Sequence, residues 1–209
     1  MTKMITKKIH WLLVLGLVGS LMSWFLIEPV TSATVDAWAT IDESITCDYS
    51  ETAVAFGTLT TGSVTTATPI LQSTSTTNLA FYHKLYDSGS GSDPGLYSST
   101  GTIDIIGSAD SSFGDTAGLT NGVEGYGIQV ATTSVGSGGT LVVATRYANK
   151  TGDNVGGLEQ GSGNELAMAS SSASVTDREL NITMKAAVSA SNAGGDYKDT
   201  LTFTCAASM

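Results

Sequence analysis

The chain has 209 residues, of which nine are Lys or Arg and 19 are Asp or Glu, giving a net charge of −10 at neutral pH. A field of this sign repels phosphate backbones and anionic lipid headgroups, so it argues against nucleic acid and membrane surfaces as partners. Beyond residue 33 the chain is dense in Thr, Ser, Gly and Val and poor in Lys, Glu and Leu, which argues against long helices and favours strands.

The N-terminus has the pattern of a secretory signal. Three lysines within the first eight residues precede the uncharged apolar run WLLVLGLVGSLMSWFLI, residues 11–27, and small residues follow it. This order predicts an apolar signal helix over residues 1–33, cleaved after Ala33, with Ala37 as a second candidate. The alternative is an uncleaved membrane anchor, although the run is shorter than the about 20 residues that span a bilayer. We therefore expect export through the general secretory route to the medium or the cell surface, with no membrane contact after cleavage.

Residues 34–209 are the right length for one domain. Apolar side chains at odd positions predict a half-buried first strand over residues 35–49, interrupted near Glu43. The other predicted strands are residues 53–59, 77–86, 101–107, 124–132, 140–148, 174–188 and 199–205. Loops rich in Gly and Ser separate them, as between antiparallel strands. The prediction is an all-β fold of two antiparallel sheets packed face to face.

The chain has two cysteines, near the two ends of the predicted domain. Cys47 lies near the end of the first predicted strand and Cys205 ends the last, both on the apolar faces of their strands. An even number of cysteines in an exported protein favours one disulfide, which would close a loop of about 159 residues and stabilise by at most roughly 5 kcal/mol. The alternatives are two buried thiols or a disulfide between two molecules, which intact mass before and after reduction distinguishes.

Both ends of the domain resemble a known group of proteins. The opening segment ATIDESITCDYSETAVAFGTLTTGS, residues 39–63, resembles the start of spore-coat-U-like and related pilus-type secreted domains. The closing segment GDYKDTLTF, residues 195–203, is similar to their final strand, G-x-Y-x-D-x-V-x-V. The sequence as a whole also resembles uncharacterised secreted surface proteins of small-genome bacteria. The resemblance implies an immunoglobulin-like sandwich at the cell surface.

One departure from the pilus-type pattern concerns the second cysteine. The family's second cysteine usually falls on the second strand, near ILQSTSTT, residues 70–77, whereas here the partner is Cys205. Family members often lack a strand that a neighbouring subunit supplies. A disulfide holds two Cα atoms about 4.4 to 6.8 Å apart, but an inserted strand would separate them by about 9.5 Å. If Cys47 is bonded to Cys205, we expect a self-closed domain whose first and last strands are neighbours.

Signals for catalysis and metal binding are weak. His83 is the one histidine beyond residue 33, and no nucleophile elbow, zinc-protease, P-loop or dinucleotide motif occurs. We therefore expect no enzyme and no cofactor. Asp87 and Asp93, in YDSGSGSDPG, are weak calcium candidates, but glycines occupy the intermediate ligand positions. Solvated turn aspartates are the better interpretation, so no metal is predicted.

Four aromatic residues, Trp38, Tyr82, Tyr86 and Tyr126, are candidates for a ligand-stacking platform, and Tyr82 and Tyr86 share strand parity. Packing between sheets explains them equally well. Two functions remain. The first is an exported, non-catalytic structural or adhesive protein of a coat, envelope layer or appendage, with other surface proteins or further copies of itself as partners. The second is a secreted carbohydrate- or ligand-binding module that recognises extracellular glycans.

Overall fold

The computed structural model describes residues 38–89, 91, 93–98, 105–108, 117–148 and 150–208. The predicted signal peptide lies outside the described residues. The chain divides into two units, Met1–Ile41 and Asp42–Met209, and the strands of the described residues belong to the second. Among the described residues, no helix has the length and apolar character needed to cross a membrane.

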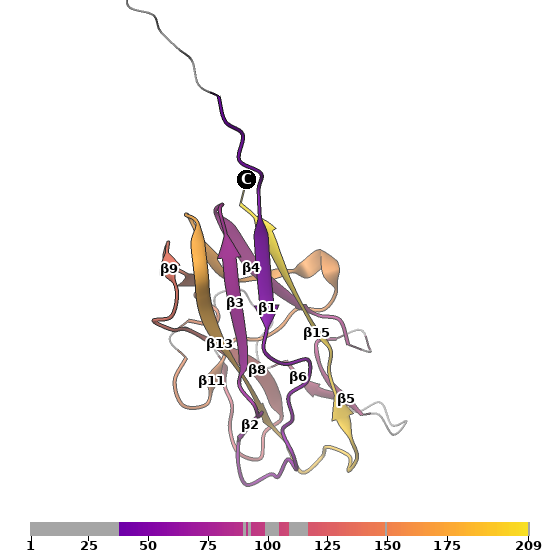
Figure 1. The fold of residues 1–209 in the computed structure, drawn as a ribbon. Coiled ribbons are helices and arrows are strands. Elements are labelled where there is room, and N and C mark those ends of the chain that lie inside the picture. Colours follow the sequence, from indigo (N-terminus) through magenta and orange to yellow (C-terminus); the bar gives the residue numbers. More distant parts are fainter. Residues whose placement is uncertain are drawn as a thin grey trace, which may run out of the picture. The chain divides into compact units, whose positions relative to one another are not determined.

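The fold is all-β, as predicted, and its one helical element in the described part of the chain is a 3-10 turn at Ser162–Asn164 (Figure 1). The longer strands are β1 (Ile45–Tyr49), β3 (Leu71–Thr77), β4 (Phe81–Asp87), β5 (Gly95–Ser98), β8 (Gly125–Thr132), β12 (Leu166–Ser171), β13 (Val175–Ala187) and β15 (Leu201–Ala207). The shorter ones are β2 (Thr65–Thr66), β6 (Ile105–Gly107), β7 (Ala117–Gly118), β9 (Ser137–Gly138), β10 (Val142–Val143), β11 (Asn154–Val155) and β14 (Tyr197–Lys198).

Two larger antiparallel sheets enclose the core. A 6-stranded sheet has the order β1-β3-β13-β2, with β8 and β9 also paired to β13, and a 4-stranded sheet has the order β10-β12-β4-β15. Alternate residues of β3 and β4 are buried, as expected for strands with one face on a core. One hydrophobic cluster takes side chains from both sheets, among them Leu71, Ile128 and Leu180 from the first and Phe81, Leu85 and Met168 from the second. This arrangement is compatible with a β-sandwich.

The predicted first strand is too long. Of residues 38–49, only Ile45–Tyr49 forms a strand, and residues 35–37 lie outside the described part. Residues 38–44 are irregular, and the side chains of Trp38 and Ile41 are 92% and 82% exposed. The reason lies in the partner strand, because Ile45 is paired with Thr77, where β3 ends. Residues 42–44 therefore lie beyond the end of the strand that pairs with β1.

Other predicted strands agree to different degrees. Residues 124–132 and 174–188 form β8 and β13 almost as predicted, and residues 199–205 largely form β15. Residues 53–59 contribute only an isolated bridge at Ala55. In residues 140–148 the strand is confined to Val142–Val143, because the chain then turns with the amides of Tyr147 and Ala148 bonded to the carbonyl of Ala144. Strands β3, β5 and β12 were not predicted, and residues 101–104 lie outside the described part.

Candidate functional site

The disulfide joins the edges of the two larger sheets. Cys47 lies on β1, at the edge of the 6-stranded sheet, and Cys205 lies on β15, at the edge of the 4-stranded sheet (Figure 1). Their sulfur atoms are 2.09 Å apart and their Cα atoms 6.5 Å apart, which confirms the predicted pairing. At this separation no further strand fits between β1 and β15 at the level of the bridge.

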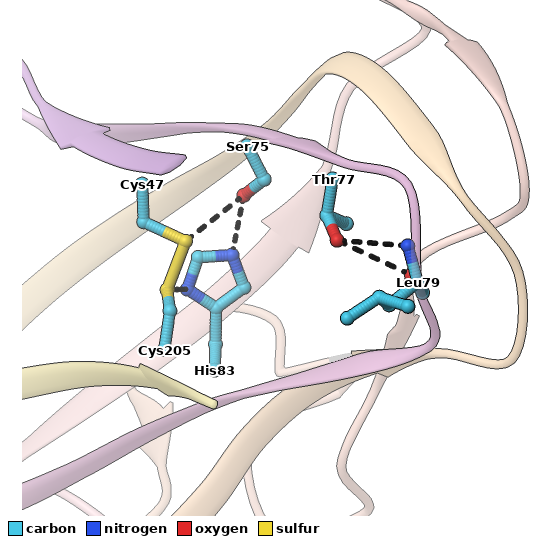
Figure 2. Close-up of a disulfide and its surroundings, with 6 residues drawn as sticks. All are labelled: Cys47, Ser75, Thr77, Leu79, His83 and Cys205. Carbon is cyan, nitrogen blue, oxygen red and sulfur yellow. Dashed lines mark hydrogen bonds between the residues drawn. A yellow bond between two sulfur atoms is a disulfide. The ribbon is translucent and has the colours of Figure 1, made fainter. Parts of the chain in front are cut away.

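A buried polar cluster surrounds the bridge (Figure 2). Ser75 is paired with Cys47 across β3 and β1, and His83 is paired with Cys205 across β4 and β15. The Ser75 Oγ atom lies 2.5 Å from His83 Nε2 and 3.9 Å from Cys47 Sγ, and His83 Nδ1 lies 3.2 Å from Cys205 Sγ. His83 is fully buried, and burial lowers its pKa from 6.5 to about 4. The imidazole is therefore neutral at physiological pH.

Past the bridge, a groove opens between the two sheet edges. β1 ends at Tyr49, and the groove is lined by the irregular residues 51–59 that follow and by residues 188–190 and 192–203. The groove has a volume of about 1400 Å³, and core side chains, among them Leu71, Tyr126 and Met184, also line it. The groove thus lies among the residues that follow β1 and those that lead into β15.

Two carboxyl groups meet beside this groove. Asp87, the last residue of β4, is buried and accepts hydrogen bonds of 2.7 Å from the amides of both Gly89 and Gly95. Asp199, which precedes β15 and lines the groove, is hydrogen-bonded to Asp87. Burial, this hydrogen bond and the charge of Asp87 raise the pKa of Asp199 to about 8. Near neutral pH the Asp199 carboxyl is therefore protonated.

The hydroxyl of Tyr126, on β8, lies next to the carboxyl pair. Burial and the neighbouring Asp199 and Asp87 raise the pKa of Tyr126 well above its ordinary value. The phenol therefore stays neutral and adds a hydrogen-bonding group beside the acids. The three side chains come from three different strands or their ends, so only the folded chain assembles them.

Gly89 allows the backbone to approach the two acids closely. A Cβ atom at this position would lie 2.5 Å from Asp199 Oδ1 and 3.1 Å from Asp87 Oδ1. We expect Gly89→Ala to reduce the free energy of unfolding by about 1–3 kcal/mol, since side chains inserted into packed sites force shifts of that cost. Urea unfolding measures the change. Gly163→Ala is the matched control, because a Cβ atom there meets nothing within 4 Å, and an equal loss in both variants would contradict the expectation.

The structure separates the four candidate aromatic residues. Tyr82 and Tyr86 share the half-buried face of β4, opposite the face that buries His83. Tyr126 is instead buried in the core and lines the groove. Trp38 belongs to the first unit of the chain and is exposed. Tyr82 and Tyr86 therefore lie on one face, as their parity predicted, and Tyr126 lies elsewhere in the second unit.

The groove contains site residues that the sequence did not single out. The rings of Tyr49 and Phe203 lie 5.2 Å apart on its wall, one from each larger sheet. Asp87 meets Asp199 rather than acting with Asp93, which is exposed and donates its amide to the Tyr97 hydroxyl. Strand parity did place Tyr49 and Phe203 on inward faces. No sequence signal linked Asp87 to Asp199.

The chain matches no family model, no curated protein and no solved structure. The groove has a mixed lining. The rings of Tyr49 and Phe203 offer flat apolar surfaces. Glu51, Asp196 and Lys198 add charged groups.

Proposed function

We propose that the protein is an exported, non-catalytic structural or adhesive component of the cell surface, with an immunoglobulin-like sandwich closed by its own disulfide. The observation that carries this proposal is the Cys47–Cys205 bridge. Disulfides form and persist in oxidising, extracytoplasmic compartments. The bridge also ties the sheet edges together, so no neighbouring strand is needed between them at that level. The signal-like N-terminus and the acidic composition support the same location.

The surroundings of the candidate acid–base groups support a non-catalytic role. A general base must come within hydrogen-bond reach of the substrate proton. His83 is fully buried, with its ring nitrogens directed to Ser75 and Cys205. Asp87 is engaged by two backbone amides and by Asp199. These contacts satisfy the groups within the protein, which is typical of structural polar networks.

The groove favours a second candidate function, a secreted carbohydrate- or ligand-binding module. Sugars combine apolar faces with hydroxyl groups, and the groove combines the rings of Tyr49 and Phe203 with the acid of Asp199. Both candidates place the protein outside the cell. They differ in what holds it there and in whether a soluble ligand occupies the groove.

Labelled antibodies on whole cells separate the two candidates. A structural component should remain on cells after high-salt washing, and the mature protein should run as a single species on unheated, non-reducing gels. Release to the medium together with affinity on a glycan array would favour the binding module. A ladder of oligomers on the unheated gel would contradict the self-closed domain. N-terminal sequencing of the same material tests cleavage after Ala33.

A further inference from the structure

The disulfide and its polar neighbours contain a set of metal-binding atoms. Ligand atoms of Cys47, His83 and Cys205 all lie within 4.8 Å of one another. They come from β1, β4 and β15, and thus from both larger sheets (Figure 2). Two sulfurs and one imidazole nitrogen form a donor set that Zn²⁺ binds strongly in proteins.

We propose that, when the disulfide is reduced, Cys47, Cys205 and His83 bind one Zn²⁺ ion, which then replaces the disulfide as the clamp between the two sheets. The reductant is a dithiol. It transfers two electrons and two protons to the bridge, forms its own disulfide and leaves one thiol on each cysteine. Zn²⁺ displaces the two thiol protons to solvent and binds both thiolates together with His83 Nδ1. No electron is transferred in the metal-binding step.

The positions of the side chains fit this exchange. Zinc bonds of about 2.3 Å to sulfur and 2.0–2.1 Å to nitrogen place tetrahedral ligands about 3.5 Å apart. His83 Nδ1 and Cys205 Sγ are already 3.2 Å apart. Ser75 engages Nε2 at 2.5 Å, and such outer partners fix the ring so that the other nitrogen faces the metal.

The backbone allows the sulfurs to separate. β1 and β15 belong to different sheets and have no hydrogen-bonded ladder between them, so moving Cys47 Sγ away from Cys205 Sγ breaks no strand pairing. Both cysteines are half-buried rather than enclosed, so a water molecule can reach the fourth coordination position. The same two edges would then be tied together under oxidising and under reducing conditions.

Cobalt binding tests the site directly. The full-length protein is reduced with dithiothreitol, desalted without oxygen and titrated with Co²⁺. We expect one Co²⁺ per chain, with thiolate-to-cobalt charge-transfer absorption in the near ultraviolet and tetrahedral bands in the visible, all displaced by Zn²⁺. The unreduced protein is the control and should show none of these bands. Absence of the charge-transfer bands after reduction overturns the proposal, whether or not the reduced chain stays folded.

Variants identify the ligands. His83→Asn should weaken Co²⁺ binding by about 10-fold or more, and Ser75→Ala should weaken it less, since Ser75 only orients the ring. Equal affinity of His83→Asn and the wild type would overturn the assignment of His83. A second measurement needs no variant, because a ligand that binds only the reduced state must favour reduction. The reduced fraction in a fixed glutathione buffer should rise when Zn²⁺ is added, and an unchanged fraction would contradict the proposal.

Discussion

Replacing both cysteines with serine, Cys47→Ser with Cys205→Ser, is expected to lower the free energy of unfolding by about 2–5 kcal/mol. The bridge has a sequence separation of 158, so without it the unfolded chain gains the freedom of a very long loop. The folded state also loses the covalent link between β1 and β15, which belong to different sheets. A loss of this size is a large fraction of the 5–15 kcal/mol that typically stabilises a domain.

Urea unfolding of the wild type and the double variant, each with and without dithiothreitol and with a chelator present, measures this effect. Reduction should destabilise the wild type to the level of the variant and leave the variant unchanged. The change should appear as a lower urea concentration at the midpoint of unfolding. The dependence of the unfolding free energy on urea concentration should change only if the unfolded state becomes more expanded without the disulfide. Equal midpoints of the oxidised wild type and the variant would show that the bridge does not contribute to stability.

The sequence could predict the strands whose inward faces are apolar. Apolar residues recur along β8 and β13, at alternate positions or in a row. This pattern can be recognised in the sequence without knowing which strand each one pairs with. β3 could not be predicted in this way, because its buried positions after Leu71 are Ser73, Ser75 and Thr77. Ser75 is buried because it faces Cys47 and His83, which come from other parts of the chain. The polar residues of β3 are therefore buried only in the folded chain, where Cys47 and His83 contact Ser75.

The candidate site could be predicted from the sequence less well than the disulfide. Two cysteines can pair within one chain in only one way, so the cysteine count suggested the bond once export was predicted. Asp87, by contrast, has the sequence context of a turn aspartate. It reaches Asp199 only because β4 and β15 are paired, with Asp87 opposite Leu201. Long-range strand pairing of this kind leaves no local pattern, which explains why the acid pair was not predicted.

The free energy of unfolding of the wild type is expected to fall as the pH rises, because Asp199 must lose a proton. Asp199→Asn is expected to prevent this fall. Asp199 has a folded-state pKa raised from 3.8 to about 8, chiefly by burial. Between these values the folded chain keeps a proton that the unfolded chain releases, so the free energy of unfolding falls as the pH increases. The stabilising contribution is complete below pH 3.8 and lost above about pH 8. Asparagine resembles the protonated acid and can donate to Asp87 at every pH.

Urea unfolding of both proteins between pH 4 and pH 9 tests this expectation. The difference between them should grow with pH in favour of Asp199→Asn, reaching the order of a few kcal/mol at pH 9, since one pKa unit corresponds to about 1.4 kcal/mol. His83 acts in the opposite direction, because its pKa of about 4 lies below the ordinary 6.5 and stability falls as the pH drops through that range. It is present in both proteins, so the difference isolates Asp199. Asp196→Asn, an exposed site on the same segment, is the matched control. A difference independent of pH would show that Asp199 is ionised in the folded protein.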